Sequence, residues 1–200
     1  MIEVILAVLS VSAAAGLRIA LPLLMIGLLS GPQLWQQVPL LSAMSPSVVL
    51  GILVSWSFFE LFVSKDRVGI RLVQILQLFC SPIVGGIMGV AIARAMDAPA
   101  DLVALLAIIS GLLALVLQLV QVGWFYRLRN GMPLWLLFIQ DILCITLVLF
   151  ALDAPKQGGL IAMLLLWFAI RSSKAWREWY RAQAHPRDRL RPRYGKQNPD

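Results

Sequence analysis

Charged residues are scarce in this chain, and their scarcity excludes an ordinary soluble domain. Only 14% of the 200 residues are Asp, Glu, Lys or Arg, and 60% are hydrophobic. Soluble domains have about 25% charged and about 45–50% apolar residues. A water-soluble fold of this size cannot bury so much apolar surface. We therefore predict an all-α protein, a polytopic bundle of transmembrane helices.

Cysteine and histidine are almost absent as well. Cys80 and Cys144 lie far apart in apolar sequence, and His185 has no Cys or carboxylate at ligand spacing. We therefore expect neither a disulfide framework nor a metal, and no cofactor. The sequence also lacks a nucleophile–base pair and a phosphate-binding loop, so we predict that the protein is not an enzyme.

Long apolar stretches are what the chain has in abundance. They occupy 4–29, 48–63, 83–96, 102–126, 133–152 and 160–170. A straight span needs about 20 residues, so the third and sixth stretches require flanking residues. We predict six spans in a membrane domain of residues 1–171, followed by a basic tail of residues 172–200. Five or seven spans are the alternatives.

The distribution of Lys and Arg predicts the orientation. The connections at 64–80 and 127–132 and the chain from 171 onward carry fourteen basic residues, whereas the opposite connections carry only Arg94 and Lys156. Cytoplasmic loops are the ones enriched in Lys and Arg. The tail is therefore expected in the cytoplasm, with the spans in the membrane that bounds it. With six spans the N-terminus is cytoplasmic too.

Two segments have the pattern of helices that lie on a membrane surface. In 67–79, Arg67, Arg71, Gln74 and Gln77 form a polar stripe at helical spacing, which predicts a helix lying flat on the membrane. After the last stretch, aromatic and basic residues alternate on neighbouring faces. We predict that they anchor the tail to anionic lipid. The anchor consists of Lys174, Trp176, Arg177, Trp179, Tyr180 and Arg181.

Basic residues interleaved with aromatics also occur in nucleic-acid-binding proteins. The position of these residues beside the last span favours lipid contact, so we expect no nucleic-acid partner. A second copy of the chain or another membrane protein remains open as a partner.

The first apolar stretch contains a buried charge and a helix breaker. As one ideal helix, 4–29 is ~39 Å long, more than the ~30 Å hydrocarbon core, yet it contains Gly16, Arg18 and Pro22. Pro22 crowds the carbonyl of Arg18, so we predict a kinked or broken helix there. A buried arginine needs a partner. The alternative is that Arg18 snorkels to the interface and Pro22 merely bends a spanning helix.

Two carboxylates inside the apolar stretches are candidate partners for Arg18. Asp141 is preferred over Glu60 because it lies nearer the middle of a predicted span. Such polar groups either bind a substrate or ion, or join helices by buried hydrogen bonds. A separate feature is the four-residue spacing of Gly85, Gly89 and Ala93, which predicts a close helix-packing face.

These residues carry a family resemblance. Ser-Ala-Ala-Ala-Gly-Leu-Arg at 12–18, Leu-Pro-Leu-Leu at 21–24, Glu60-Leu61 with Lys65, and Pro82 with its glycine-rich continuation resemble a bacterial membrane family known only as "domain of unknown function 4126". The resemblance covers most of 4–170 and implies a compact membrane domain without an established activity. This chain has Ser64 and Gln140 where the family tends to have acidic residues, which weakens a mechanism that needs all those carboxylates.

Two functions compete at this level. Residues 1–97 and 98–171 are each expected to hold three spans, which allows the inverted repeat found in secondary transporters. The first hypothesis is a small transporter of an acidic metabolite or a lipid phosphate, with Arg18 binding the anionic group. The second is a scaffold or assembly factor whose basic tail binds a partner or anionic lipid. A cavity-facing Arg18 favours transport, and an Arg18 sealed between helices favours a scaffold.

Overall fold

The regular secondary structure in the described part of the chain is all helix. In the computed structural model this part comprises residues 1–29, 45–63, 67–127 and 134–183, without the side chains at 46, 57, 60–63, 67–72, 124–127, 134, 136–137 and 174–183. These residues form seven helices and no strand, so the predicted all-α class is confirmed for them. The helices are α1 (Ile2–Leu17), α2 (Ala20–Leu29), α4 (Pro46–Val63), α5 (Arg67–Ala95), α6 (Ala100–Arg127), α7 (Leu134–Asp153) and α8 (Pro155–Gln183).

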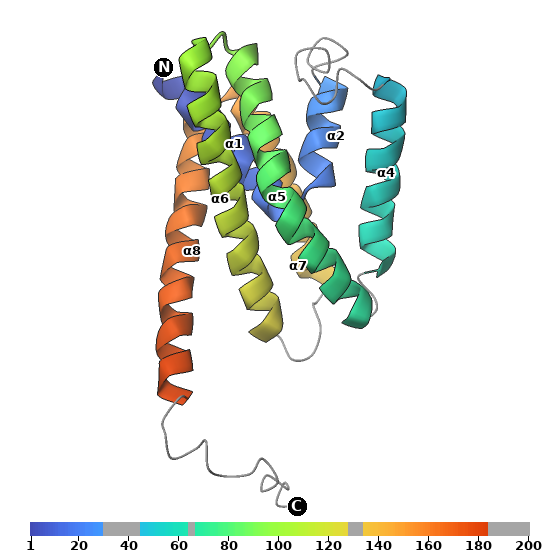
Figure 1. Ribbon diagram of the computed structural model, residues 1–200, viewed down its shortest axis with the longest axis vertical. Coiled ribbons are helices and arrows are strands. Elements are labelled where there is room, and N and C mark those ends of the chain that lie inside the picture. Colours follow the sequence, from blue (N-terminus) through green and yellow to red (C-terminus); the bar gives the residue numbers. More distant parts are fainter. Residues whose placement is uncertain (30–44, 64–66, 128–133, 184–200) are drawn as a thin grey trace, which may run out of the picture.

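Helix α1 is the centre of the bundle. It packs against α5, α6, α7 and α8 (Figure 1). Its second half is rich in small side chains, and those of 13–15 have no exposed surface. Two serines join it to its neighbours: Ser10 Oγ donates to the carbonyl of Leu147 in α7 at 2.7 Å, and Ser12 Oγ donates to the carbonyl of Ser110 in α6. Small residues and hydroxyls are typical of closely packed membrane helices.

The chain reverses direction at the end of α1. Helix α1 ends at Leu17, Arg18 is extended with φ −144° and ψ 140°, and α2 begins at Ala20. Helix α2 then returns to the end of the bundle where α1 began (Figure 1). Pro22 lies in the first turn of α2, where a missing N–H removes no intrahelical hydrogen bond. The stretch 4–29 is thus a helical hairpin, which differs from the single span expected for it.

The hairpin changes the relation between the two ends of the chain. The start of α1 and the end of α8 lie at opposite ends of the bundle (Figure 1). Six full crossings place both ends on the same side, which is what the sequence predicted. The difference arises because α1 turns back at Arg18 instead of continuing through the bundle.

Helix α5 is one continuous helix from Arg67 to Ala95 with Pro82 inside it. The separate flat helix predicted for 67–79 is therefore wrong. Its glutamines turn toward α6, where Gln118 Nε2 donates to Gln77 Oε1 at 3.2 Å. The polar stripe is satisfied partly by a neighbouring helix, so it needs no membrane surface.

Helices α5 and α6 approach each other closely along the predicted packing face. A Cβ atom at Gly85 would lie 2.6 Å from Ala114 Cβ, and one at Gly89 would lie 2.6 Å from Ser110 Cβ. Ala93 is fully buried one turn further on. Only a glycine allows the two backbones to come this close at the first two positions.

Within the described residues, two segments are long and apolar enough to cross a membrane by length and composition. They are Val73–Ala95 in α5 and Ala100–Gly123 in α6, and shorter apolar helices cover Ile2–Leu17, Ala20–Leu29 and Ser47–Trp56. Six spans therefore remain a prediction. The boundary expected at 171 falls inside α8, which continues to Gln183. The side chains of the predicted lipid anchor lie outside the described part of the structure.

Candidate functional site

An ion pair occupies the tip of the α1–α2 hairpin. Arg18 Nε lies 2.8 Å from Asp141 Oδ1 of α7, with the two side chains 12% and 24% exposed. The structure thus brings together two of the candidate residues found in the sequence. The third, Glu60, belongs to α4, and its side chain lies outside the described part.

Side chains of α7 also form hydrogen bonds with carbonyl groups at the end of α1. The last carbonyls of a helix have no intrahelical partner. Gln140 Nε2 donates to the carbonyl of Leu17 at 2.5 Å, and Cys144 Sγ lies 3.6 Å from the carbonyl of Ala14 as a weak donor. Sequence reasoning missed this role of Gln140. The available signal was an amide next to Asp141 in an otherwise apolar stretch.

Two helix ends meet at the hairpin tip and give it an electrostatic polarity. Arg18 lies at the C-terminus of α1, where the helix dipole favours a cation. Two residues later α2 begins, and its first amides point out of the helix toward the same tip. A cation and a helix N-terminus together favour a bound anion. In this structure the carboxylate of Asp141 is the anion paired with Arg18.

A layer of glutamines lies at the level of the hairpin tip. Gln74 and Gln77 come from α5 and Gln118 from α6, and their exposed fractions are 7%, 9% and 1%. Gln118 lies beside the hairpin tip because Leu117, the residue before it, packs against the end of α1. A Cβ atom at Gly16 would lie 2.9 Å from Leu117 Cβ. Three buried amides in an apolar bundle form a distinct polar layer.

Several buried polar atoms of this layer, and of Ser81 in α5 and Gln121 in α6, have no hydrogen-bond partner among the described residues. They are Gln74 Nε2, Ser81 Oγ, Gln118 Oε1 and Gln121 Oε1. Burying an unpaired amide or hydroxyl costs about 1–3 kcal/mol by mutational measures. Such groups therefore favour water or a polar ligand entering the layer.

A comparison of the sequence with models of known families identifies the family of this chain. A family model described as "Domain of unknown function (DUF4126)" matches residues 5–175. The chain belongs to this family. The match confirms the resemblance seen in the sequence and includes the hairpin, Asp141 and the glutamine layer. Searches of curated proteins and of solved structures gave no match.

Among its described residues, the site of this DUF4126 domain offers charge and hydrogen bonding. Within the described ranges, no three His, Cys, Asp or Glu side chains gather as metal ligands. Cys80 and Cys144 are free thiols. The site can bind an anion at Arg18 and hydrogen-bond a polar molecule through its amides.

Proposed function

We propose that this DUF4126 protein is a multi-pass protein of the bacterial inner membrane with its basic tail in the cytoplasm. The outer surface of the bundle supports the proposal, because large apolar side chains are exposed on several helices. Phe79 is 72% exposed, Ile108 62%, Phe138 65% and Trp167 57%. Apolar side chains exposed in such number on one small bundle suit lipid. The side that carries the tail has fourteen basic residues, and the opposite side has two. This difference supports an orientation with the tail in the cytoplasm.

The proposed activity is transport of a small anionic molecule, either an acidic metabolite or a lipid phosphate. The observation that carries it is the ion pair at the tip of a helical hairpin that turns inside the bundle. Non-helical backbone at membrane depth is tolerated where it is buried in protein or lines a water-filled cavity. Broken helices with their N-termini facing an anionic group are typical of secondary transporters.

The mechanism is an exchange of partners at Arg18. An unpaired arginine inside a membrane costs several kcal/mol, so Arg18 requires a counter-ion throughout the cycle. Asp141 supplies it in the resting state. An incoming carboxylate or phosphate takes its place on Arg18 and on the first amides of α2, while the glutamine layer solvates the remaining polar atoms. Release of the substrate restores the pair with Asp141.

A scaffold or assembly factor is the alternative, and one observation favours it. Arg18 is only 12% exposed and already paired, as in a helix junction that never opens. In that case the basic tail carries the function by binding anionic lipid or a partner protein. The inverted repeat expected for residues 1–97 and 98–171 requires three spans in each half. Because α1 and α2 form a hairpin, only α4 and α5 of the first half cross the bundle, so the transport proposal does not rest on a repeat.

Access of water to the hairpin tip distinguishes the two functions. Ala20 is 1% exposed at the start of α2, and Ile108 faces outward from α6. In a Cys80→Ser/Cys144→Ser background, we expect Ala20→Cys to react with a charged methanethiosulfonate reagent and Ile108→Cys, in the lipid, to remain unmodified. Inorganic phosphate is expected to slow the reaction at Ala20→Cys. An Ala20→Cys variant that folds but never reacts would contradict transport and favour the scaffold.

A further inference from the structure

A row of polar side chains lies between α5 and α6. Gln74, Gln77 and Ser81 of α5 are spaced at i, i+3 and i+7, so they share one face of the helix. Gln118 and Gln121 of α6 are three residues apart and share a face as well. The hydrogen bond from Gln118 Nε2 to Gln77 Oε1 shows that the two faces meet. We call the glutamine layer together with Ser81 and Gln121 the polar row.

The order of the polar row along the bundle follows from the register of α5 and α6. Three contacts each pair a later residue of α5 with an earlier residue of α6: Gln77 with Gln118, Gly85 with Ala114, and Gly89 with Ser110. This antiparallel register places Gln74 level with Gln121, nearer the end of the bundle where α5 begins. Ser81 lies further in, toward Gly85.

Four atoms of the polar row have no hydrogen-bond partner among the residues that the structure describes. They are Gln74 Nε2, Ser81 Oγ, Gln118 Oε1 and Gln121 Oε1. The set contains an amide N–H donor, a hydroxyl that can donate or accept, and two amide oxygens that accept. A cation would satisfy only the acceptors and an anion only the donors. Water both donates and accepts, so it is the ligand that matches the whole set.

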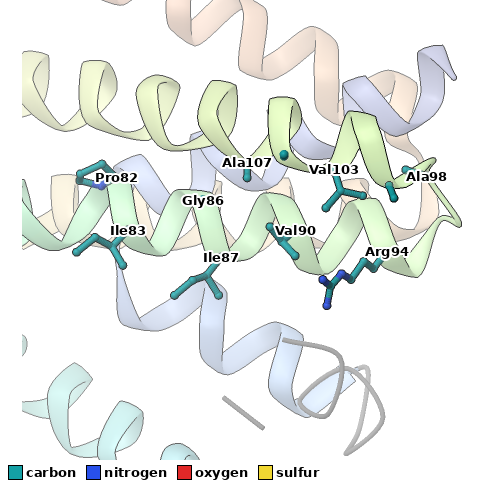
Figure 2. A pocket seen from close by; sticks show the side chains of 11 residues that line it. Pro82, Ile83, Gly86, Ile87, Val90, Arg94, Ala98, Val103 and Ala107 are labelled. Carbon is teal, nitrogen blue, oxygen red and sulfur yellow. The ribbon is translucent and has the colours of Figure 1, made fainter. Parts of the chain in front are cut away.

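The polar row is confined to one part of the α5–α6 pair. Beyond Pro82 the pair carries an apolar groove of about 670 Å³, along which Figure 2 shows Ile83 and Ile87 of α5 with Val103 of α6. Pro82 also has no N–H with which to bond the carbonyl of Leu78, which belongs to the level of the row. Ordered water is one of the groups that satisfy such carbonyls in membrane helices.

A close contact between backbones closes the inner end of the polar row. A Cβ atom at Gly85 would lie 2.6 Å from Ala114 Cβ, and Ser110 Oγ donates to the carbonyl of Gly85. Backbones this close leave no room for water between them. Water in the row therefore has an entrance only from the end of the bundle where α5 begins.

The end of α1 lies beside the polar row. Gly16 lies against Ala114 and Leu117 of α6, so α1 ends beside Gln118. Helix α6 continues from Gln118 to Arg127, which is about 14 Å at 1.5 Å per residue. Helix α1, the centre of the bundle, does not extend over that length. The exposed fractions agree with an entrance there, because Gln121 is partly exposed, Gln118 is 1% exposed and Ser81 has no exposed surface.

We propose that the polar row holds a file of water molecules that enters between α5 and α6 from the cytoplasm and ends below Gly85, at the level of the hairpin tip. The proposal rests on the proposed position of the tail in the cytoplasm, but it does not depend on transport at Arg18. It gives the interior of the bundle a hydrated route from one side only.

Two buried serines replaced by cysteine test the proposal. Ser81 and Ser110 both lack exposed surface, but Ser81 belongs to the polar row, whereas Ser110 lies beyond the contact at Gly85. The full-length protein, in a Cys80→Ser/Cys144→Ser background, is treated in inside-out vesicles with Ag⁺, an ion small enough to travel with water. After denaturation, a fluorescent maleimide measures the thiol that has not reacted. Ser81→Cys should react at least about tenfold faster than Ser110→Cys, because a thiol needs water to ionise.

Three controls separate the water file from other routes to the thiol. Ile108→Cys, which faces outward from α6, should react as slowly as Ser110→Cys, since Ag⁺ does not enter lipid. Gln121→Leu should slow the reaction of Ser81→Cys by removing the polar group at the entrance. Gln157→Leu, the same substitution at an exposed glutamine of α8, should leave that reaction unchanged. In spheroplasts, which expose the opposite face of the membrane, Ser81→Cys should stay unreacted.

The outcomes distinguish the water file from the orientation on which it rests. Equal rates for Ser81→Cys and Ser110→Cys in the folded protein would overturn the water file. Reaction of Ser81→Cys in spheroplasts alone would contradict the position of the tail and hence entry from the cytoplasm. If Ser81→Cys fails to fold by circular dichroism, Gln118→Cys replaces it, because its side chain is smaller than the native one.

Discussion

Arg18 and Asp141 are oppositely charged side chains that the fold places 2.8 Å apart and largely out of solvent. Removing one partner of a buried pair leaves the other charge uncompensated and costs about 3–5 kcal/mol. Because these side chains keep 12% and 24% exposure, we expect the low end of that range for Arg18→Ala and for Asp141→Ala. The double variant should lose less than the sum of the two single losses. Thermal unfolding in detergent measures all three.

The exchange Arg18→Asp/Asp141→Arg is the control for this pair. It keeps both charges and reverses their positions, so it should recover part of the lost stability. Losses that add fully, with no recovery in the exchanged variant, would show that the two side chains do not stabilise each other.

Glycine positions along α5 give a second prediction with its control in the same helix. At Gly89 a Cβ atom would lie 2.6 Å from Ser110 Cβ, whereas at Gly86 its nearest contact is 3.4 Å away. Gly89→Ala should therefore lower the unfolding temperature, because overpacking costs about 1–3 kcal/mol. Gly86→Ala should leave it unchanged or raise it slightly through helix propensity. Equal melting of the two variants would contradict the close packing of α5 on α6.

Single residues were predicted from the sequence where their chemistry is rare. A charge inside an apolar stretch needs a partner, and so few carboxylates were available that Asp141 could be selected before the structure. The hydrogen bond from Gln140 to Leu17 could not be found this way. It depends on which part of α7 lies beside the end of α1, and that alignment results from tertiary packing and not from a local sequence signal.

At the scale of elements, the first apolar stretch is where the structure differs most from the prediction. An uninterrupted run of 4–29 is compatible with one span or with a hairpin, because both bury the same residues. Its break was expected at Arg18, but the sequence did not show that α2 runs back. The reversal depends on Gly16, whose position allows α1 to end against Ala114 and Leu117 of α6.

Because of this geometry, substitutions of Pro22 and of Gly16 should affect the stability of the protein differently. Pro22→Ala should change the unfolding temperature little, since the first turn of α2 needs no N–H at that position. Gly16→Val should destabilise the protein strongly, because a Cβ atom there would lie 2.9 Å from both the Ala114 carbonyl and Leu117 Cβ. A large loss for Pro22→Ala with a small one for Gly16→Val would contradict the position of the turn.

The end of α8 and the tail carry a prediction that rests on the sequence alone. A peptide of residues 171–200 should bind vesicles with phosphatidylglycerol more tightly than neutral ones, by about 1 kcal/mol for each cation near the surface. Lys174→Gln/Arg177→Gln/Arg181→Gln should remove much of the difference, with Trp176 and Trp179 still giving weak binding. Tryptophan fluorescence during vesicle titration measures both. Equal binding to neutral and anionic vesicles would show that electrostatic attraction contributes nothing to the binding of the tail.

At the scale of the whole molecule, composition predicted the all-α class, whereas the orientation stays a prediction from the basic residues. The number of crossings of the bundle depends on the hairpin. With α1 and α2 turning back, five of the helices that the structure describes cross the bundle: α4, α5, α6, α7 and α8. An odd number of crossings separates the two ends of the chain. Counting apolar stretches cannot detect this, because a hairpin and a span have the same composition.

The central claim is that the α1–α2 hairpin returns to the side of the membrane on which α1 begins. Cysteine labelling of spheroplasts tests it most directly. In a Cys80→Ser/Cys144→Ser background, a membrane-impermeant maleimide should label Ile2→Cys and Gln157→Cys in intact spheroplasts. It should label Asn130→Cys only after the membrane is opened. Labelling of Ile2→Cys only in opened membranes, together with Asn130→Cys, would mean that the first stretch crosses the membrane and would contradict the hairpin.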